Sequence, residues 1–207
     1  MPRPAYDRVQ NRLIETCSRL FLADGIRGTE MQRIAADAGI SRSTLYRYVS
    51  DKDQLVFMVI IDMMFEMTNR CLASALDPGM NGFEKLKRFS HILVSELTSR
   101  PDFVRFLTEF DLIYGGRADD TPDTRLYAEC MDKLIHREAQ FLFEGMSDGS
   151  VRPMDDPMLF NATLIHTIYG LAKCAIPGGL LSASRYTIPD ERVITAAVDI
   201  LVDSVRA

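Results

Sequence analysis

Several absences limit what this chain of 207 residues can be. Its longest uninterrupted apolar run ends at Ile61, before Asp62. That run is far shorter than the roughly 18 residues that a transmembrane helix needs. The N-terminal segment MPRPAYDRVQ carries basic residues but no following apolar stretch, so it lacks the middle part of a secretory signal. We therefore expect a cytoplasmic protein with no membrane partner.

Cysteine is also sparse, and the cysteines lie far apart. Cys17, Cys71, Cys130 and Cys174 include no CxxC pair, and no nearby histidine completes the spacing of a zinc site. Isolated cysteines in a reducing compartment behave as small apolar residues. We expect four reduced core thiols, with no metal and no cofactor.

The usual motifs of catalysis are missing as well. The sequence contains no GxSxG elbow, no glycine-rich phosphate-binding loop and no HExxH pair. His136 and Glu138 resemble the start of a zinc-deaminase motif, but the downstream PCxxC is absent. These absences argue against an enzyme.

Charge is unevenly divided along the chain. The total is −5, yet residues 1–55 carry nine Lys or Arg against seven Asp or Glu, and residues 56–207 carry fifteen against twenty-two. Affinity for nucleic acid follows the local basic surface and not the total charge. The division indicates a mildly basic N-terminal region followed by an acidic one.

Apolar residues recur at the spacing of α-helices. Val9, Leu13, Cys17 and Leu20 lie on one stripe of a first helix, which is predicted to end at Gly25. Signals for β-strands are few. The sequence therefore predicts an all-α fold of about nine helices.

Capping residues mark three helix starts in the next segment. Thr29 and Gln32 form a predicted capping box, Ser41 is expected to cap a short helix, and Ser50 with Asp53 a long one. The long helix is expected to reach about residue 76. Further helices are expected over residues 83–99, 102–114, 124–144, 157–176 and 189–206.

The segment from residue 29 to residue 55 has the spacing of a helix-turn-helix. Ala35 is small where two helices cross, Gly39 suits the tight turn, and Leu45 packs the second helix against the first. Ile34 and Ile40 complete a small core. A helical hairpin that binds nothing would show the same spacing.

The outer face of the second helix favours DNA binding over that alternative. Arginine pairs bidentately with guanine, and hydroxyls contact several base edges in the major groove. Tyr46 and Tyr48 offer hydroxyls to phosphates, and Thr29 and Lys52 place donors at positive helix ends. The predicted DNA-binding residues are Thr29, Ser41, Arg42, Ser43, Thr44, Tyr46, Arg47, Tyr48 and Lys52.

The stretch GTEMQRIAADAGISRSTLYRYVSDKDQL closely resembles the N-terminal domain of TetR-family regulators. The resemblance covers about residues 8–55. Ser43 departs from it, because the family often has glycine there, and Tyr48-Val49 replaces a common His-Phe pair. The first difference concerns the operator sequence, and the second concerns local packing.

The resemblance implies a helix-turn-helix DNA-binding domain at residues 1–55 and a helical ligand-binding and dimerisation domain at residues 56–207. It also implies a homodimer that binds a pseudo-palindromic operator, most simply as a repressor. Family members pair their last two helices in a four-helix bundle. The apolar positions of those helices are Leu159, Phe160, Leu164, Ile168, Leu171, Val193, Ile194, Ala197, Ile200, Leu201 and Val205, each of which also suits an internal core.

A small-molecule effector is expected to bind between the helices of the second domain, where apolar side chains surround a few polar ones. Methionine, phenylalanine, tyrosine and histidine on otherwise apolar helices are the candidates, although each also suits a structural role. We expect a largely hydrophobic or aromatic effector. The candidate residues are Met63, Met67, His91, Phe106, Phe110, Tyr114, Tyr127, His166 and Tyr169.

A helical carrier of small molecules with an inactive DNA-binding region is the other non-enzymatic alternative. It would share the fold and the pocket but would bind no operator. The donors Arg42, Thr44, Arg47 and Lys52 argue against it. Measured affinity for DNA separates the two hypotheses.

Overall fold

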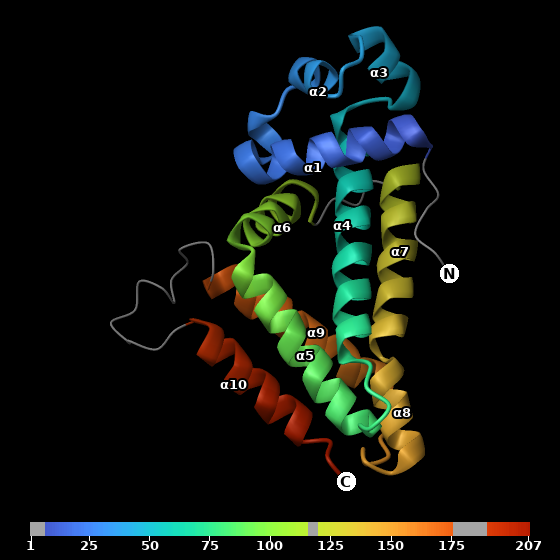
Figure 1. Cartoon of the computed structure of the whole chain (residues 1–207), viewed down its shortest axis with the longest axis vertical. Coiled ribbons are helices and arrows are strands. Elements are labelled where there is room, and N and C mark those ends of the chain that lie inside the picture. Colours follow the sequence, from blue (N-terminus) through green and yellow to red (C-terminus); the bar gives the residue numbers. More distant parts are fainter. Residues whose placement is uncertain (1–6, 116–119, 176–189) are drawn as a thin grey trace. The chain divides into compact units, whose positions relative to one another are not determined.

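A computed structural model describes residues 7–115, 120–175 and 190–207. These residues form an all-α fold, as predicted, and the only β pairing among them is an isolated bridge between Val151 and Arg206. No helix of the described part is long and apolar enough to cross a membrane. The helices are α1 (Arg8–Gly28), α2 (Met31–Asp37), α3 (Arg42–Tyr48), α4 (Lys52–Ala75), α5 (Gly82–Ser99), α6 (Pro101–Tyr114), α7 (Pro122–Glu138), α8 (Gln140–Asp148), α9 (Pro157–Ala175) and α10 (Asp190–Asp203) (Figure 1).

The helices fall into two compact units. Unit 1 comprises residues up to 66 together with 105–131, and unit 2 comprises residues 67–104 together with 132–207. The first three helices belong to unit 1, and α5, α8, α9 and α10 belong to unit 2. Unit 1 therefore contains more than the segment 1–55, because it includes most of α6 and part of α7.

Helix α1 forms as the sequence pattern predicts. The Asp7 carboxylate accepts hydrogen bonds from the amides of Val9 and Gln10, and the Asp7 amide donates to Gln10 Oε1, which completes a reciprocal cap. The predicted break lies at Gly25, whose φ of 78° is strained for any residue with a Cβ atom. One further turn, Ile26 to Gly28, continues beyond the break.

Two of the predicted helix caps are wrong. Thr29 does not cap α2, because its hydroxyl donates to the Gly25 carbonyl at 2.8 Å and the first residue outside α2 is Glu30. Asp51, not Ser50, caps α4: its carboxylate accepts from the Gln54 amide at 2.9 Å. The third cap is confirmed, since the Ser41 hydroxyl accepts from the Thr44 amide at 3.1 Å.

Unit 2 is built around α5, which packs against α8, α9 and α10. Phe89 of α5 and Phe141 of α8 lie with ring centroids 6.2 Å apart in its core. The two helices approach so closely at Gly82 and Gly145 that a Cβ atom on Gly82 would overlap the Gly145 backbone. Glycine at this crossing is therefore a packing requirement.

One of the later helices differs from prediction. The segment expected as one helix over residues 124–144 is divided into α7 and α8 at Ala139, which is fully buried. Helix α10 begins at Asp190, and the expected start at Pro189 lies outside the described residues, as does the expected end of α9 at residue 176.

Cys174 corrects the expectation of four core thiols. It lies exposed on α9, whereas Cys17, Cys71 and Cys130 are buried as predicted. Burial raises the pKa of both Cys17 and Cys71 to about 12, so these two thiols stay protonated at neutral pH.

Candidate functional site

The turn between α2 and α3 is a helix-turn-helix turn closed by backbone hydrogen bonds. Gly39 has a φ of 65°. Its amide donates to the Ala36 carbonyl at 3.0 Å, and the Ile40 amide donates to the Ala35 carbonyl at 3.0 Å. This pair of bonds is the Schellman arrangement, which ends a helix and turns the chain sharply. Gly39 therefore fixes the angle at which α3 leaves α2.

Helix α3 has one buried anchor and an open outer face. Leu45 is 0% exposed, and Ile34 and Ala35 of α2 are also buried, whereas Ile40, which was also predicted for this small core, is half-buried. Arg42, Ser43, Tyr46 and Arg47 are exposed, while Thr44 and Tyr48 are half-buried. Every predicted DNA-binding residue of α3 thus reaches the surface.

Three hydroxyls cluster at the N-terminus of α3. The Ser41 Oγ lies 2.8 Å from the Ser43 Oγ and 2.9 Å from the Thr44 Oγ1. Each hydroxyl can donate or accept, so the cluster can meet either kind of group on a base edge. Arg42 and Arg47 add guanidinium donors on the same short helix.

Thr29 and Lys52 have partners within the protein. Thr29 is fully buried, so its hydroxyl does not reach a phosphate in this conformation. The Lys52 ammonium donates to the carbonyls of Ile26 at 3.0 Å and Thr29 at 3.2 Å. Lys52 therefore ties the start of α4 to the turn that precedes α2.

Glu109 of α6 binds backbone amides of the same turn, a role that sequence reasoning missed. Its carboxylate accepts from the Ile26 amide at 2.7 Å and from the Arg27 amide at 3.0 Å. A Cβ atom on Gly25 would lie 2.8 Å from Glu109 Oε2. Because 83 residues separate Ile26 from Glu109, no local pattern could have indicated the contact.

The structure brings three of the predicted effector residues together. Phe110, Tyr114 and Tyr127 meet Phe57, which sequence reasoning had not selected, and the paired ring centroids lie 5.0–5.8 Å apart. Burial, with a smaller effect of Asp111, raises the pKa of Tyr127 to about 12. These four rings form an aromatic cluster in unit 1.

A cavity of about 360 Å³ opens beside this aromatic cluster. Phe57 and Tyr114 form its apolar wall, and the Tyr114 hydroxyl donates to Asp53 Oδ1 at 2.8 Å. Asp51 and Asp123 lie on its rim. Burial and the two neighbouring carboxylates raise the pKa of Asp123, which indicates that further negative charge is unfavourable here.

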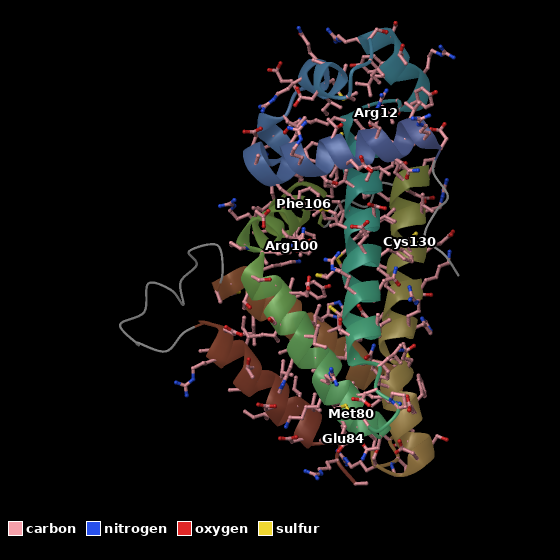
Figure 2. All side chains as sticks on the ribbon, in the orientation of Figure 1. Arg12, Met80, Glu84, Arg100, Phe106 and Cys130 are labelled. Atoms are coloured by element: carbon pink, nitrogen blue, oxygen red, sulfur yellow. The ribbon has the colours of Figure 1, made fainter. Side chains whose placement is uncertain are left out.

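The remaining predicted effector residues lie elsewhere. Phe106 of α6 stacks on Phe21 of α1 at 6.1 Å and belongs to the core of unit 1 (Figure 2). His91 is bonded to Asp199 at 2.9 Å on the surface, and the exposed His166 is bonded to the carbonyl of Ala162. Phe106 thus lies in the core of unit 1, and His91 and His166 have hydrogen-bond partners of their own. Met63 and Met67 are buried, and Tyr169 is half-buried.

Unit 2 contains a buried polar group that no sequence motif indicated. Glu138, at the end of α7, is 3% exposed, and the Thr68 hydroxyl donates to its Oε1 at 3.0 Å. Burial raises the pKa of Glu138 to about 7, although the Thr68 hydrogen bond and Arg137 lower it. Asn161 of α9 is also buried, and its Nδ2 donates to the Ile135 carbonyl at 2.9 Å.

The apolar residues of α9 and α10 divide between core and surface. Leu164, Ile168, Ile194 and Val205 are buried within the chain, so they are core residues. Leu159, Val193 and Ile200 are exposed. Leu159 (64%) and Ile200 (73%) are the most exposed of these.

Within the described ranges, no group of three or more His, Cys, Asp or Glu side chains could hold a metal ion.

Residues 13–59 match the model of the bacterial regulatory proteins, tetR family. The match includes the whole of α2 and α3 and the start of α4.

Two curated relatives extend this match beyond the helix-turn-helix. The HTH-type transcriptional regulator Rv0472c of Mycobacterium tuberculosis is 29% identical over 146 residues, which is 70% of this chain and 60% of that protein. The chain thus matches less than two thirds of that relative's length. The HTH-type transcriptional repressor KstR2 of Mycolicibacterium smegmatis is 26% identical over 179 residues, covering 85% of this chain and 83% of the repressor.

Solved structures share the fold. FadR, a transcriptional regulator from Bacillus subtilis solved in complex with stearoyl-CoA, aligns with a TM-score of 0.69 and 15% identity. The alignment covers 95% of this chain and 99% of FadR. At this identity the likeness concerns the fold, an N-terminal helix-turn-helix followed by a helical domain.

Proposed function

Because this chain belongs to the tetR family of bacterial regulatory proteins, we propose that it regulates transcription by binding a pseudo-palindromic operator as a homodimer. The observation that carries the proposal is α3, which buries Leu45 and presents Arg42, Ser43 and Arg47 to solvent. One such short helix reads few base pairs, and a two-fold dimer doubles the contact. The exposed Leu159 and Ile200 support a dimer contact through α9 and α10.

Repression is the simplest form of this regulation. A dimer on an operator that overlaps a promoter blocks polymerase by occupancy alone and needs no further contact. KstR2 of Mycolicibacterium smegmatis, which resembles this chain over most of its length, is described as a repressor. The same reasoning favours a division in which residues 1–55 bind DNA and the helices that follow respond to an effector and dimerise.

The effector is proposed to bind in the cavity beside the aromatic cluster. Phe57 and Tyr114 suit an aromatic or hydrophobic molecule. The acidic rim disfavours an anionic one, since burial together with the carboxylates of Asp51 and Asp53 already raises the pKa of Asp123. FadR, by contrast, was solved with stearoyl-CoA, so acyl-CoA thioesters belong in the screen as the anionic comparison.

Effector binding is proposed to act through the first turn of α4. Tyr114 holds Asp53 on that turn, and Lys52, one residue earlier, holds the carbonyls of Ile26 and Thr29. A ligand that displaces Tyr114 favours the conformation in which this turn has moved. Operator affinity then falls to an extent set by how much more tightly the ligand binds that conformation than the DNA-binding one.

Selection of bound sequences from a random DNA pool tests the proposal. The purified protein should enrich a pseudo-palindrome, and light scattering should give two chains per duplex. Failure to enrich any sequence at low salt, with the protein folded and dimeric, would contradict operator binding and favour the carrier alternative.

Arg47→Ala is expected to weaken specific operator binding by about 1–3 kcal/mol, since a bidentate contact to guanine is worth that much. Fluorescence anisotropy with the selected operator and with scrambled DNA measures the specific part. Arg88→Ala is the matched control, because Arg88 is also exposed but belongs to unit 2 and pairs with Asp77. If Arg47→Ala and the parent protein bind the operator equally tightly, Arg47 makes no specific base contact.

Lys52→Ala is expected to weaken binding to all DNA sequences alike. The slope of log K against the logarithm of salt concentration should also become shallower by about one, as the loss of one phosphate contact implies. Because the ammonium also holds two carbonyls, unfolding should become easier by about 1–2 kcal/mol. Anisotropy over a salt series and urea unfolding measure both effects. A loss confined to one operator would contradict this assignment.

A further inference from the structure

A polar groove of about 600 Å³ lies along the first turns of α1 in unit 1. Its lining residues are Arg8, Val9, Asn11, Arg12 and Glu15. Both arginines and the glutamate are exposed, and neither guanidinium forms an ion pair with any residue that the structure describes. The groove therefore carries two positive charges against one negative charge, and its net charge is basic.

The spacing of the arginines along α1 shows which way this groove faces. Arg8, Arg12 and Arg19 follow one another at intervals of four and seven residues, so they share one stripe of the helix. The stripe lies opposite the buried Cys17. Its last member, Arg19, bonds Asp37 at the end of α2 at 3.1 Å. The stripe therefore borders the helix-turn-helix, and Figure 2 shows Arg12 on the side of α1 that is nearer α3.

The chemistry of the two arginines suits phosphate. A guanidinium forms charge-assisted and often bidentate hydrogen bonds with phosphate oxygens. Four residues of α-helix advance by about 6 Å, so Arg8 and Arg12 can contact separate phosphates of one strand. The family match begins at residue 13, so it assigns neither arginine a role.

We propose that Arg8 and Arg12 bind phosphates of the DNA backbone outside the base pairs that α3 contacts. The inference rests on the proposed operator binding and extends the bound DNA beyond the pseudo-palindrome. Contacts of this kind read no sequence, but they add affinity and fix the register of the protein on the duplex. Glu15 opposes them, because its carboxylate lies in the same groove and repels the same phosphates.

Two duplexes test the contact: one is trimmed to the selected pseudo-palindrome, and the other carries about ten more base pairs, one helical turn, at each end. Anisotropy on the intact protein should show tighter binding to the longer duplex. The double variant Arg8→Ala/Arg12→Ala should weaken binding to the longer duplex by at least about tenfold, because each half of the dimer loses both phosphate contacts. Its affinity for the trimmed duplex should equal that of the parent protein. Glu15→Gln should bind the longer duplex more tightly than the parent does.

Arg27→Ala is the matched control, because Arg27 is an exposed arginine in the last turn of α1. It should preserve the preference for the longer duplex. The inference is overturned if the double variant binds both duplexes as the parent does, if it weakens both equally, or if Arg27→Ala has the same effect.

Failure to select any operator would overturn the proposed function and this inference with it. Equal binding of the parent protein to the two duplexes would overturn this inference alone, and an acidic protein surface would become the partner to test.

Discussion

Replacing Glu138 by glutamine is expected to make the protein more stable at pH 8, by about 3 kcal/mol, and to change its stability little at pH 4. The change keeps the side chain's shape and its oxygen acceptor for the Thr68 hydroxyl. It removes the group whose ionisation is penalised by burial.

The direction follows from the raised pKa. The pKa of Glu138 is about 7 in the folded chain and near its ordinary value of 4.5 in the unfolded chain. Between these values the folded state binds more protons, so its stability falls as pH rises through that interval. A shift of this size corresponds to about 3 kcal/mol at 1.36 kcal/mol per pH unit. The penalty is complete above pH 7, and glutamine avoids it.

Urea unfolding of both proteins from pH 4 to pH 8 measures the effect as a widening gap between the two stability curves. Glu15→Gln is the control, since Glu15 is exposed on α1. Parallel curves for the parent protein and Glu138→Gln would show that Glu138 has the same pKa in the folded and unfolded states, which would contradict the pKa raised by burial.

Gly82→Ala is expected to destabilise unit 2 by about 3 kcal/mol or more. The new Cβ atom would overlap the backbone of Gly145 and Glu144, and backbone atoms cannot turn away as a flexible side chain can. Overpacking of this kind costs about 1–3 kcal/mol even where side chains give way. Helices α5 and α8 would have to separate at their closest crossing.

Gly79→Ala isolates the packing effect, because it lies in the same connection and its Cβ atom would meet only Asp77 Oδ1 at an ordinary 3.4 Å. Thermal unfolding should show a large decrease in Tm for Gly82→Ala and little change for Gly79→Ala. Similar Tm values for the two variants would contradict a close crossing of α5 and α8.

Helices were predictable from the sequence because their signals are local. The apolar stripe through Leu13 and Cys17 and the break at Gly25 depend only on residues within one helix. The caps were harder to predict, because Thr29 and Ser50 lie beside other polar groups that compete for the same amides. The Thr29 hydroxyl donates to the Gly25 carbonyl instead, and Asp51 caps the helix that Ser50 was expected to cap.

The exposed outer face of α3 was predictable for the same reason. Leu45 and Arg47 lie two residues apart on one short helix, so burial of the first places the second on the outer side. Which partners Lys52 and Glu109 bind was not predictable, since both reach the turn at Ile26 from distant positions. Sequence spacing carries no information about such contacts.

The candidate effector residues were selected by residue type and helical position. Phe110, Tyr114 and Tyr127 among them meet in space. The same criteria selected Phe106 and His91, which pack against Phe21 and bind Asp199. Residue type alone does not separate a pocket wall from a core ring.

Under the proposed function, the three hydroxyls at the start of α3 have a consequence for the range of promoters under control. The Ser41 hydroxyl is bonded to those of Ser43 and Thr44, and each can donate or accept. Base pairs that face them should vary between natural operators, whereas a guanine opposite Arg47 should not. A regulator built in this way tolerates drift at some operator positions and can therefore retain several unlinked genes under one signal.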